Sequence, residues 1–293
     1  LNKTNLYVYH LIGGEVVQLS NDTLRVRASK KIKSDFILGS IDEPYVRTYN
    51  WSMPWPVDYY LVSLKTGKSE LVLKKIGFGG DLSPTGKYVT YFDSDSSNYF
   101  ALEVATGGKI CLTCSEDSIN WQMDVNGAPR DAGPLGIEGW TRNDKTMWIQ
   151  SEFDIWEYSF EKGLLNSITE EEGAMNGIEM RPYRWSYDST YLDMENIYIK
   201  GFNTKSKRTH YYTFVDHLGH FDLTELAHFD ANVNSIQKAK KSAAILFKKM
   251  TFQEYPNLYL SDIEFKNGIR ISNANPQLKE YKLGTVELID WTS

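Results

Sequence analysis

Two cysteines three residues apart are the first residues whose spacing could support chemistry. Cys111 and Cys114 have the spacing of a zinc knuckle or a redox pair. The sequence holds no second pair of cysteines, and no helix start is expected beside them that would activate a thiol. They follow the turn at Gly107 on an expected strand, where residues three apart point to opposite faces, so we expect no disulfide between them. We interpret both as small packing residues.

Three histidines and two aspartates also stand close together in the sequence. His217, His220 and His228 lie near Asp216 and Asp222, and imidazole with carboxylate is a common ligand set for transition metals. A turn of six residues does not hold these side chains in a coordination geometry. We interpret them as turn and edge-strand residues, and we predict neither a metal site nor a cofactor.

Two acidic stretches are interpreted as solvated loops. Asp93–Asn98 begins like a calcium-binding loop, but its sixth position is not glycine and Val104 stands where a bidentate glutamate is needed. Thr169–Glu172 has residues that can cap or begin a short helix. Gly173 follows, however, and no apolar stripe with a period of 3.6 residues continues the pattern. Neither stretch is assigned a function.

Hydrolytic chemistry at a serine would require a different local sequence. A nucleophile elbow has the form Gly-x-Ser-x-Gly, because only small flanking residues let the hydroxyl stand clear beside the oxyanion donors. That pentapeptide does not occur in this sequence. We therefore assign no catalytic residue and predict that this chain alone is not an enzyme.

The tryptophans offer possible contact surfaces rather than catalysis. Most aromatic rings are expected to pack between sheets, but the insertion Asn50–Val57 carries two tryptophans and two prolines between expected strands. Proline stiffens a loop, and loop residues tend to be exposed. We predict that Trp51 and Trp55 contact a substrate or a neighbouring domain.

The elements that must position these residues are strands, because one short unit returns six times. In each copy an alternating apolar strand leads to a turn that ends in glycine, followed by a second strand, which is the pattern of an antiparallel hairpin. The turn glycines are Gly14, Gly67, Gly107, Gly163, Gly219 and Gly268. Their average spacing of about 51 residues is close to that of propeller blades with inserted loops.

Two further strands are expected before each hairpin. The turn Asp81–Gly86 is followed by the apolar strand Lys87–Phe92, and similar patterns recur in Gly139–Gln150 and Arg184–Asp193. The sequence therefore predicts an all-β fold, a β-propeller of four-stranded antiparallel blades. About six to seven blades are expected. The sequence leaves open whether the blade at the N-terminus is complete. A β-sandwich would also use many short strands, but it does not predict a repeat over the whole chain.

Composition supports a globular protein and excludes several classes. The chain has 293 residues, of which 41% are hydrophobic, 24% charged and 14% aromatic, so intrinsic disorder is excluded. The formal net charge of −6 gives no field that would attract nucleic acid. No run of about 20 apolar residues is present, so no membrane span is predicted. Two cysteines leave the redox compartment undecided.

Several of these segments resemble one known family. Ser83–Tyr88, Gly139–Lys145 with Asp154–Trp156, and above all Ile271–Gly284 with Val286–Ser293 resemble the N-terminal β-propeller domain of large bacterial serine peptidases of the prolyl oligopeptidase family. The dipeptidyl aminopeptidases and acylaminoacyl-peptidases belong to that family. The Ser-Pro-x-Gly-Lys turn occurs in many propellers, including those of the TolB type, whereas the C-terminal segment is more specific.

The resemblance implies a domain organisation. Residues 1–293 would form the propeller domain or most of one, and 286–293 would begin the strand that leads into an α/β-hydrolase domain. In such a family the catalytic serine, aspartate and histidine lie beyond Ser293. The family's dipeptidyl peptidases hold the substrate amino terminus with a glutamate pair, but Glu170–Glu172 lacks the surrounding pattern and is not assigned that role.

The function implied is that of a lid. A propeller over the active site would admit short peptides and exclude folded proteins, with the hydrolase domain and peptide substrates as its partners. The peptide specificity, the oligomeric state and any export signal stay open, and the resemblance implies a bacterial periplasm. The alternative is a stand-alone TolB-like propeller that serves as a platform for protein interactions. A propeller glycosidase would need two convergent carboxylates and is disfavoured by the C-terminal match.

Overall fold

The computed structural model describes residues 4–28, 32–51, 53–184, 190–217, 220–287, 289 and 291. The chain divides into two compact units, and each is described by itself. The first takes Leu1–Ser167 with Asp188–Asp193, and the second takes Ile168–Tyr187 with Met194–Ser293. That residues 1–293 form one propeller domain stays a prediction.

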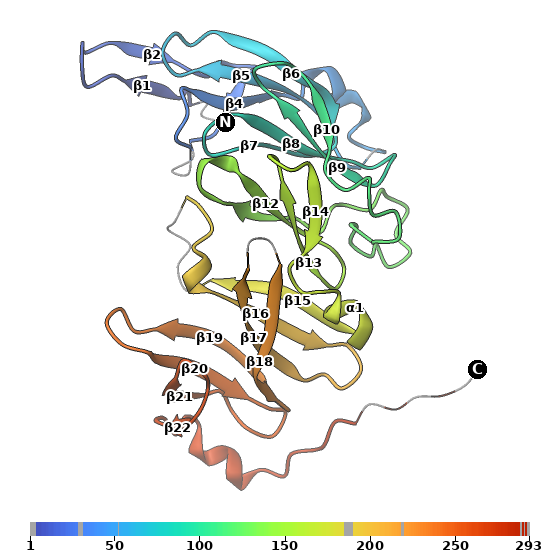
Figure 1. The fold of residues 1–293 in the computed structure, drawn as a ribbon, viewed down its shortest axis with the longest axis vertical. Helices are drawn as coiled ribbons and strands as arrows, with labels where there is room; N and C mark the ends of the chain where they lie inside the picture. The colour runs from blue at the N-terminus through green and yellow to red at the C-terminus, as the bar shows by residue number, and fades with distance from the viewer. Residues whose placement is uncertain are drawn as a thin grey trace. The chain divides into compact units, whose positions relative to one another are not determined.

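The first unit holds one two-stranded sheet and three four-stranded sheets, all antiparallel (Figure 1). The two-stranded sheet pairs β1 (Tyr7–Tyr9) with β2 (Val16–Gln18). The next sheet contains β3 (Arg25–Val26), β4 (Phe36–Ile41), β5 (Val57–Ser63) and β6 (Ser69–Ile76), with the 3-10 helix η1 (Glu43–Thr48) between β4 and β5. The third contains β7 (Phe78–Leu82), β8 (Tyr88–Asp93), β9 (Asn98–Glu103) and β10 (Lys109–Cys111). The last contains β11 (Ile137–Trp140), β12 (Thr146–Gln150), β13 (Ile155–Ser159) and β14 (Leu164–Ser167), with η2 (Arg142–Asp144) before β12.

The described residues of the second unit form two four-stranded antiparallel sheets and three short helices. Its first sheet contains β15 (Ile178–Arg184), β16 (Ile197–Asn203), β17 (Thr209–Asp216) and β18 (Phe221–Phe229). Its second sheet contains β19 (Asn232–Lys238), β20 (Ala244–Met250), β21 (Asn257–Asp262) and β22 (Ile269–Arg270). The helices are α1 (Glu172–Asn176), η3 (Met194–Asn196) and η4 (Pro276–Glu280). Within the described residues no helix is long and apolar enough to cross a membrane.

The predicted fold class is confirmed by the strand pairing. In each four-stranded sheet the strands pair in chain order, each antiparallel to the next, as they do in a propeller blade. The predicted turn glycines Gly67, Gly107, Gly163 and Gly268 each lie between the third and fourth strands of a blade, whereas the turn glycine at position 219 is outside the described residues. The first predicted copy, which turns at Gly14, forms the sheet β1–β2 alone. The described residues thus contain five complete blades and one strand pair.

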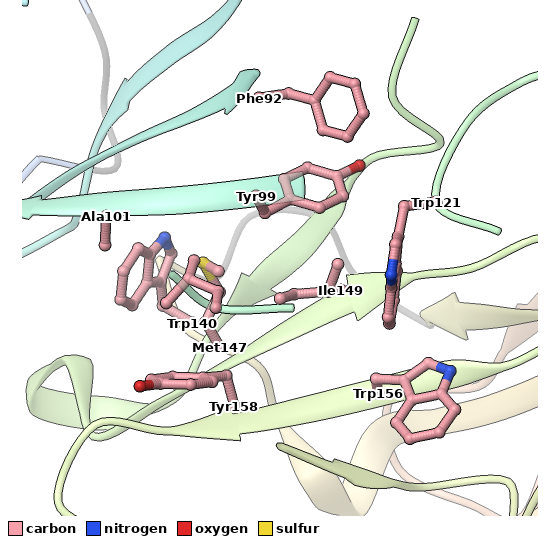
Figure 2. Packing of buried hydrophobic residues seen from close by; sticks show 10 residues of the cluster. Phe92, Tyr99, Ala101, Trp121, Trp140, Met147, Ile149, Trp156 and Tyr158 are labelled. Atoms are coloured by element: carbon pink, nitrogen blue, oxygen red, sulfur yellow. The ribbon is translucent and has the colours of Figure 1, made fainter. Parts of the chain in front are cut away.

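Neighbouring blades within a unit bury aromatic and aliphatic side chains between them. Between β7–β10 and β11–β14, the buried cluster consists of Phe92, Tyr99, Ala101, Leu112, Trp121, Trp140, Met147, Ile149, Trp156 and Tyr158 (Figure 2). In the second unit, Tyr211, Val233, Ile236, Ile245 and Phe247 form the equivalent cluster between β15–β18 and β19–β22. Trp140, Trp148 and Trp156 are buried, as predicted for packing residues, whereas Trp185 lies outside the described residues.

The prediction for the acidic stretch Thr169–Glu172 was partly wrong, because a helix begins at its last residue. Glu170 and Glu171 have the positive φ values of a loop, 53° and 61°, but α1 starts at Glu172. The helix makes little more than one turn and ends at Gly177, whose left-handed backbone lets its N–H bond to the carbonyl of Gly173. A helix this short is fixed by its cap, so the missing apolar stripe did not exclude it. The other acidic stretch, Asp93–Asn98, forms the polar turn between β8 and β9 that was predicted.

A buried carboxylate links the turns of two neighbouring blades, and its loss should destabilise the fold. The Asp144 carboxylate, at the end of η2, accepts a hydrogen bond from the backbone N–H of Thr85 at 3.1 Å and another from its hydroxyl. Thr85 lies in the turn between β7 and β8. We expect Asp144→Ala to lower the free energy of unfolding by about 2 kcal/mol, since it leaves the part-buried N–H and hydroxyl donors of Thr85 without this partner. Urea denaturation measures this change, and Asp117→Ala at an exposed position is the control. A change under about 0.5 kcal/mol in Asp144→Ala would show that the link between the two turns is dispensable.

Candidate functional site

The predicted contact residues Trp51 and Trp55 lie in an exposed loop between η1 and β5. Trp55 is 52% exposed, and its indole N–H donates a hydrogen bond to the carbonyl of Tyr49 at 3.1 Å. Its ring also stacks on the ring of Tyr49, with 4.9 Å between centroids. Trp51 is 76% exposed. The loop therefore holds one indole in place and presents the other to solvent.

The base of this loop is anchored to β5 by a buried aspartate. The hydroxyl of Tyr45, in η1, donates a hydrogen bond of 2.6 Å to Oδ1 of Asp58, and the backbone N–H of Lys75 donates to the same oxygen at 2.8 Å. Desolvation, followed by the hydrogen bond to Asp58, raises the pKa of Tyr45 to about 12. The raised pKa keeps the phenol protonated, and η1 tied to the blade, in the alkaline range where an ordinary tyrosine would ionise.

The prediction that Cys111 and Cys114 are separate packing residues was wrong, because they form a disulfide. That prediction assumed that one strand runs through both residues. Strand β10 instead ends at Cys111, and the chain bends at the buried residues Leu112 and Thr113. The bend brings the two Cα atoms to 5.7 Å, which is within the normal range for a disulfide.

The predicted group of histidines and aspartates divides into two clusters. At the turn between β17 and β18, Nε2 of His217 lies 3.1 Å from Oδ2 of Asp222, and Nε2 of His220 lies 3.5 Å from Oδ1 of the same carboxylate. Glu170 approaches His220 at 3.8 Å. These side chains are all exposed. His228 is not part of this turn cluster.

His228 instead meets two residues that the sequence analysis did not select, His210 and Glu225. Oε1 of Glu225 lies 3.1 Å from Nδ1 of His210 and 2.9 Å from Nδ1 of His228. The exposed fractions of the side chains are 12% for His210, 54% for His228 and 40% for Glu225. We call these three residues the cross-strand cluster. Two imidazole nitrogens and one carboxylate oxygen can together bind a cation.

A cavity of about 290 Å³ lies beside β21, β22 and η4 in the second unit. Its lining includes Arg270, whose guanidinium donates to the carbonyl of Ser272 at 2.7 Å and to Oδ1 of Asn273 at 2.8 Å. A carboxylate oxygen of Glu254 lies 3.7 Å from the same group. The charge of Arg270 is thus used to hold the loop after β22.

Comparison with known proteins finds likeness only among solved structures. No family model matches the chain, and no curated protein matches it. The matching structures include TolB from Acinetobacter baumannii, with 14% identity, coverage of 91% of this chain and 59% of that chain, and a TM-score of 0.38. TolB and peptidase chains are among its structural neighbours.

The two peptidase structures are matched over a smaller share of their length. One comes from a structural and mechanistic study of two prolyl endopeptidases. It has 11% identity and a TM-score of 0.45, and the match covers 91% of this chain and 38% of that chain. The other is dipeptidyl peptidase 4 from Porphyromonas gingivalis. It has 11% identity and a TM-score of 0.40, and the match covers 90% of this chain and 49% of that chain. This chain therefore spans between 38% and 59% of the length of the three structures. The likeness concerns the fold, which rests on the strand pairing above.

The segment after η4 exposes apolar side chains outside any blade. Among its described residues no regular element follows Glu280. Tyr281, Val286 and Ile289 are each at least 66% exposed, and Trp291 is 81% exposed. The described residues of this segment thus leave several large apolar side chains in contact with solvent. The predicted linking strand 286–293 lies within this segment, and it stays a prediction.

Proposed function

We propose that this chain is the non-catalytic propeller of a serine peptidase of the prolyl oligopeptidase family, and that it restricts the access of peptides to a catalytic α/β-hydrolase domain. The observation that carries the proposal is the exposed apolar segment after the last blade. Val286, Ile289 and Trp291 are exposed there, in the part of the sequence whose resemblance to the family is most specific. Burying such side chains against a second domain would contribute about 1.5–3 kcal/mol each.

The rigidity of the blades supports the proposed gating role. Within each unit, two neighbouring blades pack through a cluster of buried aromatic and aliphatic side chains, so their backbones resist deformation. A rigid lid of this kind excludes a folded protein by size, whereas an unfolded peptide can pass through a narrow opening. This role needs no catalytic group in the chain, and the sequence supplies no nucleophile elbow.

The proposal is tested with the natural gene product that contains this chain. We expect a fluorophosphonate probe, which labels activated serines, to label that product but not the purified 293-residue chain. We also expect the natural product to cleave a short peptide and to leave the same sequence uncut inside a folded protein. A reading frame without a hydrolase domain would overturn the proposal and favour the TolB-like platform. Equal cleavage of both substrates would overturn the gating role.

Within this proposal, Trp51 and Trp55 serve as a contact surface for the substrate or the hydrolase domain. Tyr49 holds the ring of Trp55 by stacking and by a hydrogen bond. This arrangement lowers the entropy lost on contact, and aromatic residues of this kind often dominate binding energies.

Replacing both tryptophans should therefore impair the natural peptidase. We expect Trp51→Ala with Trp55→Ala to lower kcat/KM for a peptide substrate about tenfold, which corresponds to about 1.4 kcal/mol. Steady-state kinetics measure the effect. The matched control is Leu164→Ala, which removes an exposed apolar side chain from β14. Unchanged kcat/KM together with unchanged domain docking in the double variant would exclude the contact.

A further inference from the structure

We propose that the cross-strand cluster of His210, Glu225 and His228 is a binding site for a divalent transition metal of the Zn²⁺ type. The three residues come from two neighbouring strands of one blade and lie on one face of it. Their ligand atoms all lie within 4.8 Å of one another. Two histidines with one glutamate form a ligand set that zinc takes in proteins, with a further position left for water.

The strand pairing explains why these side chains meet. His210 on β17 is the direct partner of His228 on β18, and Tyr212 is the direct partner of Glu225. Residues 225 and 228 are three apart, so in a regular strand they would point to opposite faces. The register shifts between Tyr211 and Tyr212, which adds one residue on the β18 side. Such a bulge re-aims a side chain, and here it turns Glu225 to the face of both histidines.

The distances suit a metal as well as they suit hydrogen bonds. Zinc binds histidine nitrogen and carboxylate oxygen at about 2.0–2.2 Å, so two ligands in tetrahedral geometry lie about 3.3 Å apart. The oxygen of Glu225 lies 3.1 and 2.9 Å from the two Nδ1 atoms. The same oxygen faces both nitrogens. A cation could therefore be placed between these three atoms with little movement of the side chains.

The surroundings pack closely around His210 and hold it in place, whereas the other two members of the cluster are open to solvent. Gly201 on β16 is the strand partner of His210, and a Cβ added there would lie 3.2 Å from the Cβ of His210. The ring of Tyr212 is parallel to that of His210 within 11°, at 6.0 Å between centroids. His210 is thus held between a small neighbour and a ring. His228 and Glu225 are open to solvent, which gives an ion an entry path and room for water.

The turn cluster of His217, His220, Asp222 and Glu170 is a weaker candidate and serves as the comparison. Its contacts to His220 are longer, 3.5 and 3.8 Å, and every member is exposed. The carboxylate of Asp222 is also shared with His217 at 3.1 Å. A variant at His217 therefore alters an exposed histidine of the same blade without touching the cross-strand cluster.

Zinc titration of the purified chain by calorimetry, after treatment with a chelator, tests the site. We expect one Zn²⁺ per chain. We expect the dissociation constant to rise at least tenfold in His228→Gln and in Glu225→Gln, and to stay within twofold in the control His217→Gln. If the unaltered chain bound Zn²⁺ no more tightly than the double variant Glu225→Gln with His228→Gln, the proposal would be overturned. Loss of binding in His220→Gln with retention in His228→Gln would also overturn it, because this result would place the ion in the turn cluster, where Glu170, His220 and Asp222 bring their ligand atoms together.

A second measurement on the unaltered chain covers the case in which a variant does not fold. Co²⁺ bound by nitrogen and oxygen in a four- or five-coordinate site gives visible absorption bands that hydrated Co²⁺ lacks. We expect these bands at one equivalent, and we expect Zn²⁺ to remove them by competition. We also expect Zn²⁺ to protect His228, but not His217, from diethyl pyrocarbonate. Absence of the bands, or equal modification of His228 with and without Zn²⁺, would overturn the proposal.

Discussion

Replacing Tyr99 with alanine is expected to lower the free energy of unfolding by about 4 kcal/mol, because it removes a large ring from a closed interface between two blades. Tyr99 is fully buried in the cluster drawn in Figure 2. Its ring forms T-shaped pairs with the rings of Phe92 and Trp121, at centroid distances of 4.9 Å and 6.4 Å. The neighbours on both sides belong to paired strands or ordered loops, so the cavity cannot close without moving a blade.

The hydroxyl of Tyr99 contributes separately from the ring. It accepts a hydrogen bond of 2.7 Å from the backbone N–H of Gly136, just before β11. We expect Tyr99→Phe, which keeps the ring, to cost about 1–2 kcal/mol, because that N–H loses its partner. Urea denaturation at neutral pH measures both variants. The control is Tyr7→Ala, which removes a half-exposed ring from β1 and should cost under about 1 kcal/mol. Equal losses for Tyr99→Ala and Tyr7→Ala would show that this interface does not hold the blades together.

The blades could be predicted because their signals are local. Alternating residues such as Phe100 and Leu102 define a half-buried strand, and Gly107 supplies the positive φ of 72° that the following turn requires. These features depend on a few neighbouring residues and repeat along the chain. The predicted turn Asp81–Gly86 began two residues too early, because Asp81 and Leu82 end β7, but the predicted strand Lys87–Phe92 matches β8 to within one residue. Such signals are sufficient to predict the blades, because antiparallel pairing of consecutive strands needs no information from distant segments.

The disulfide and the cross-strand cluster could not be predicted by the same reasoning. The disulfide depends on where β10 ends, and one residue more of strand would have kept Cys111 and Cys114 apart. The cluster depends on the bulge in β18. The register near the turn pairs Val215 with Asp222 and Thr213 with Thr224, and if continued it would pair His210 with Ala227. The shift by one residue replaces Ala227 with His228. Local sequence carries no clear signal for such a shift.

Raising the pH above 10 is expected to destabilise the fold, because several tyrosines are held in their neutral form. Burial, followed by the charge of Glu264, raises the pKa of Tyr198 to about 12. Burial also raises the pKa of Tyr99 and Tyr211. A phenol with a raised pKa stabilises the fold fully below the unfolded value of about 10, and this contribution is lost as pH rises towards the folded value. Each such group should lower the free energy of unfolding by about 1–2 kcal/mol across that range, after allowance for partial solvent screening.

Tyr198 offers the sharpest test of this pH dependence. Its hydroxyl donates a hydrogen bond of 3.2 Å to the carbonyl of Ile263, which links β16 to the turn after β21. Phenylalanine at position 198 cannot ionise, so the free energy of unfolding of Tyr198→Phe should fall less between pH 8 and pH 11 than that of the unaltered chain, by about 1 kcal/mol. The control Tyr281→Phe, at an exposed position, should follow the unaltered chain. Urea denaturation at both pH values measures this difference, and ultraviolet absorbance follows tyrosinate formation. If Tyr198→Phe instead showed the same loss as the unaltered chain, Tyr198 would ionise equally in the folded and unfolded states, and the alkaline transition would have to arise from the other buried phenols.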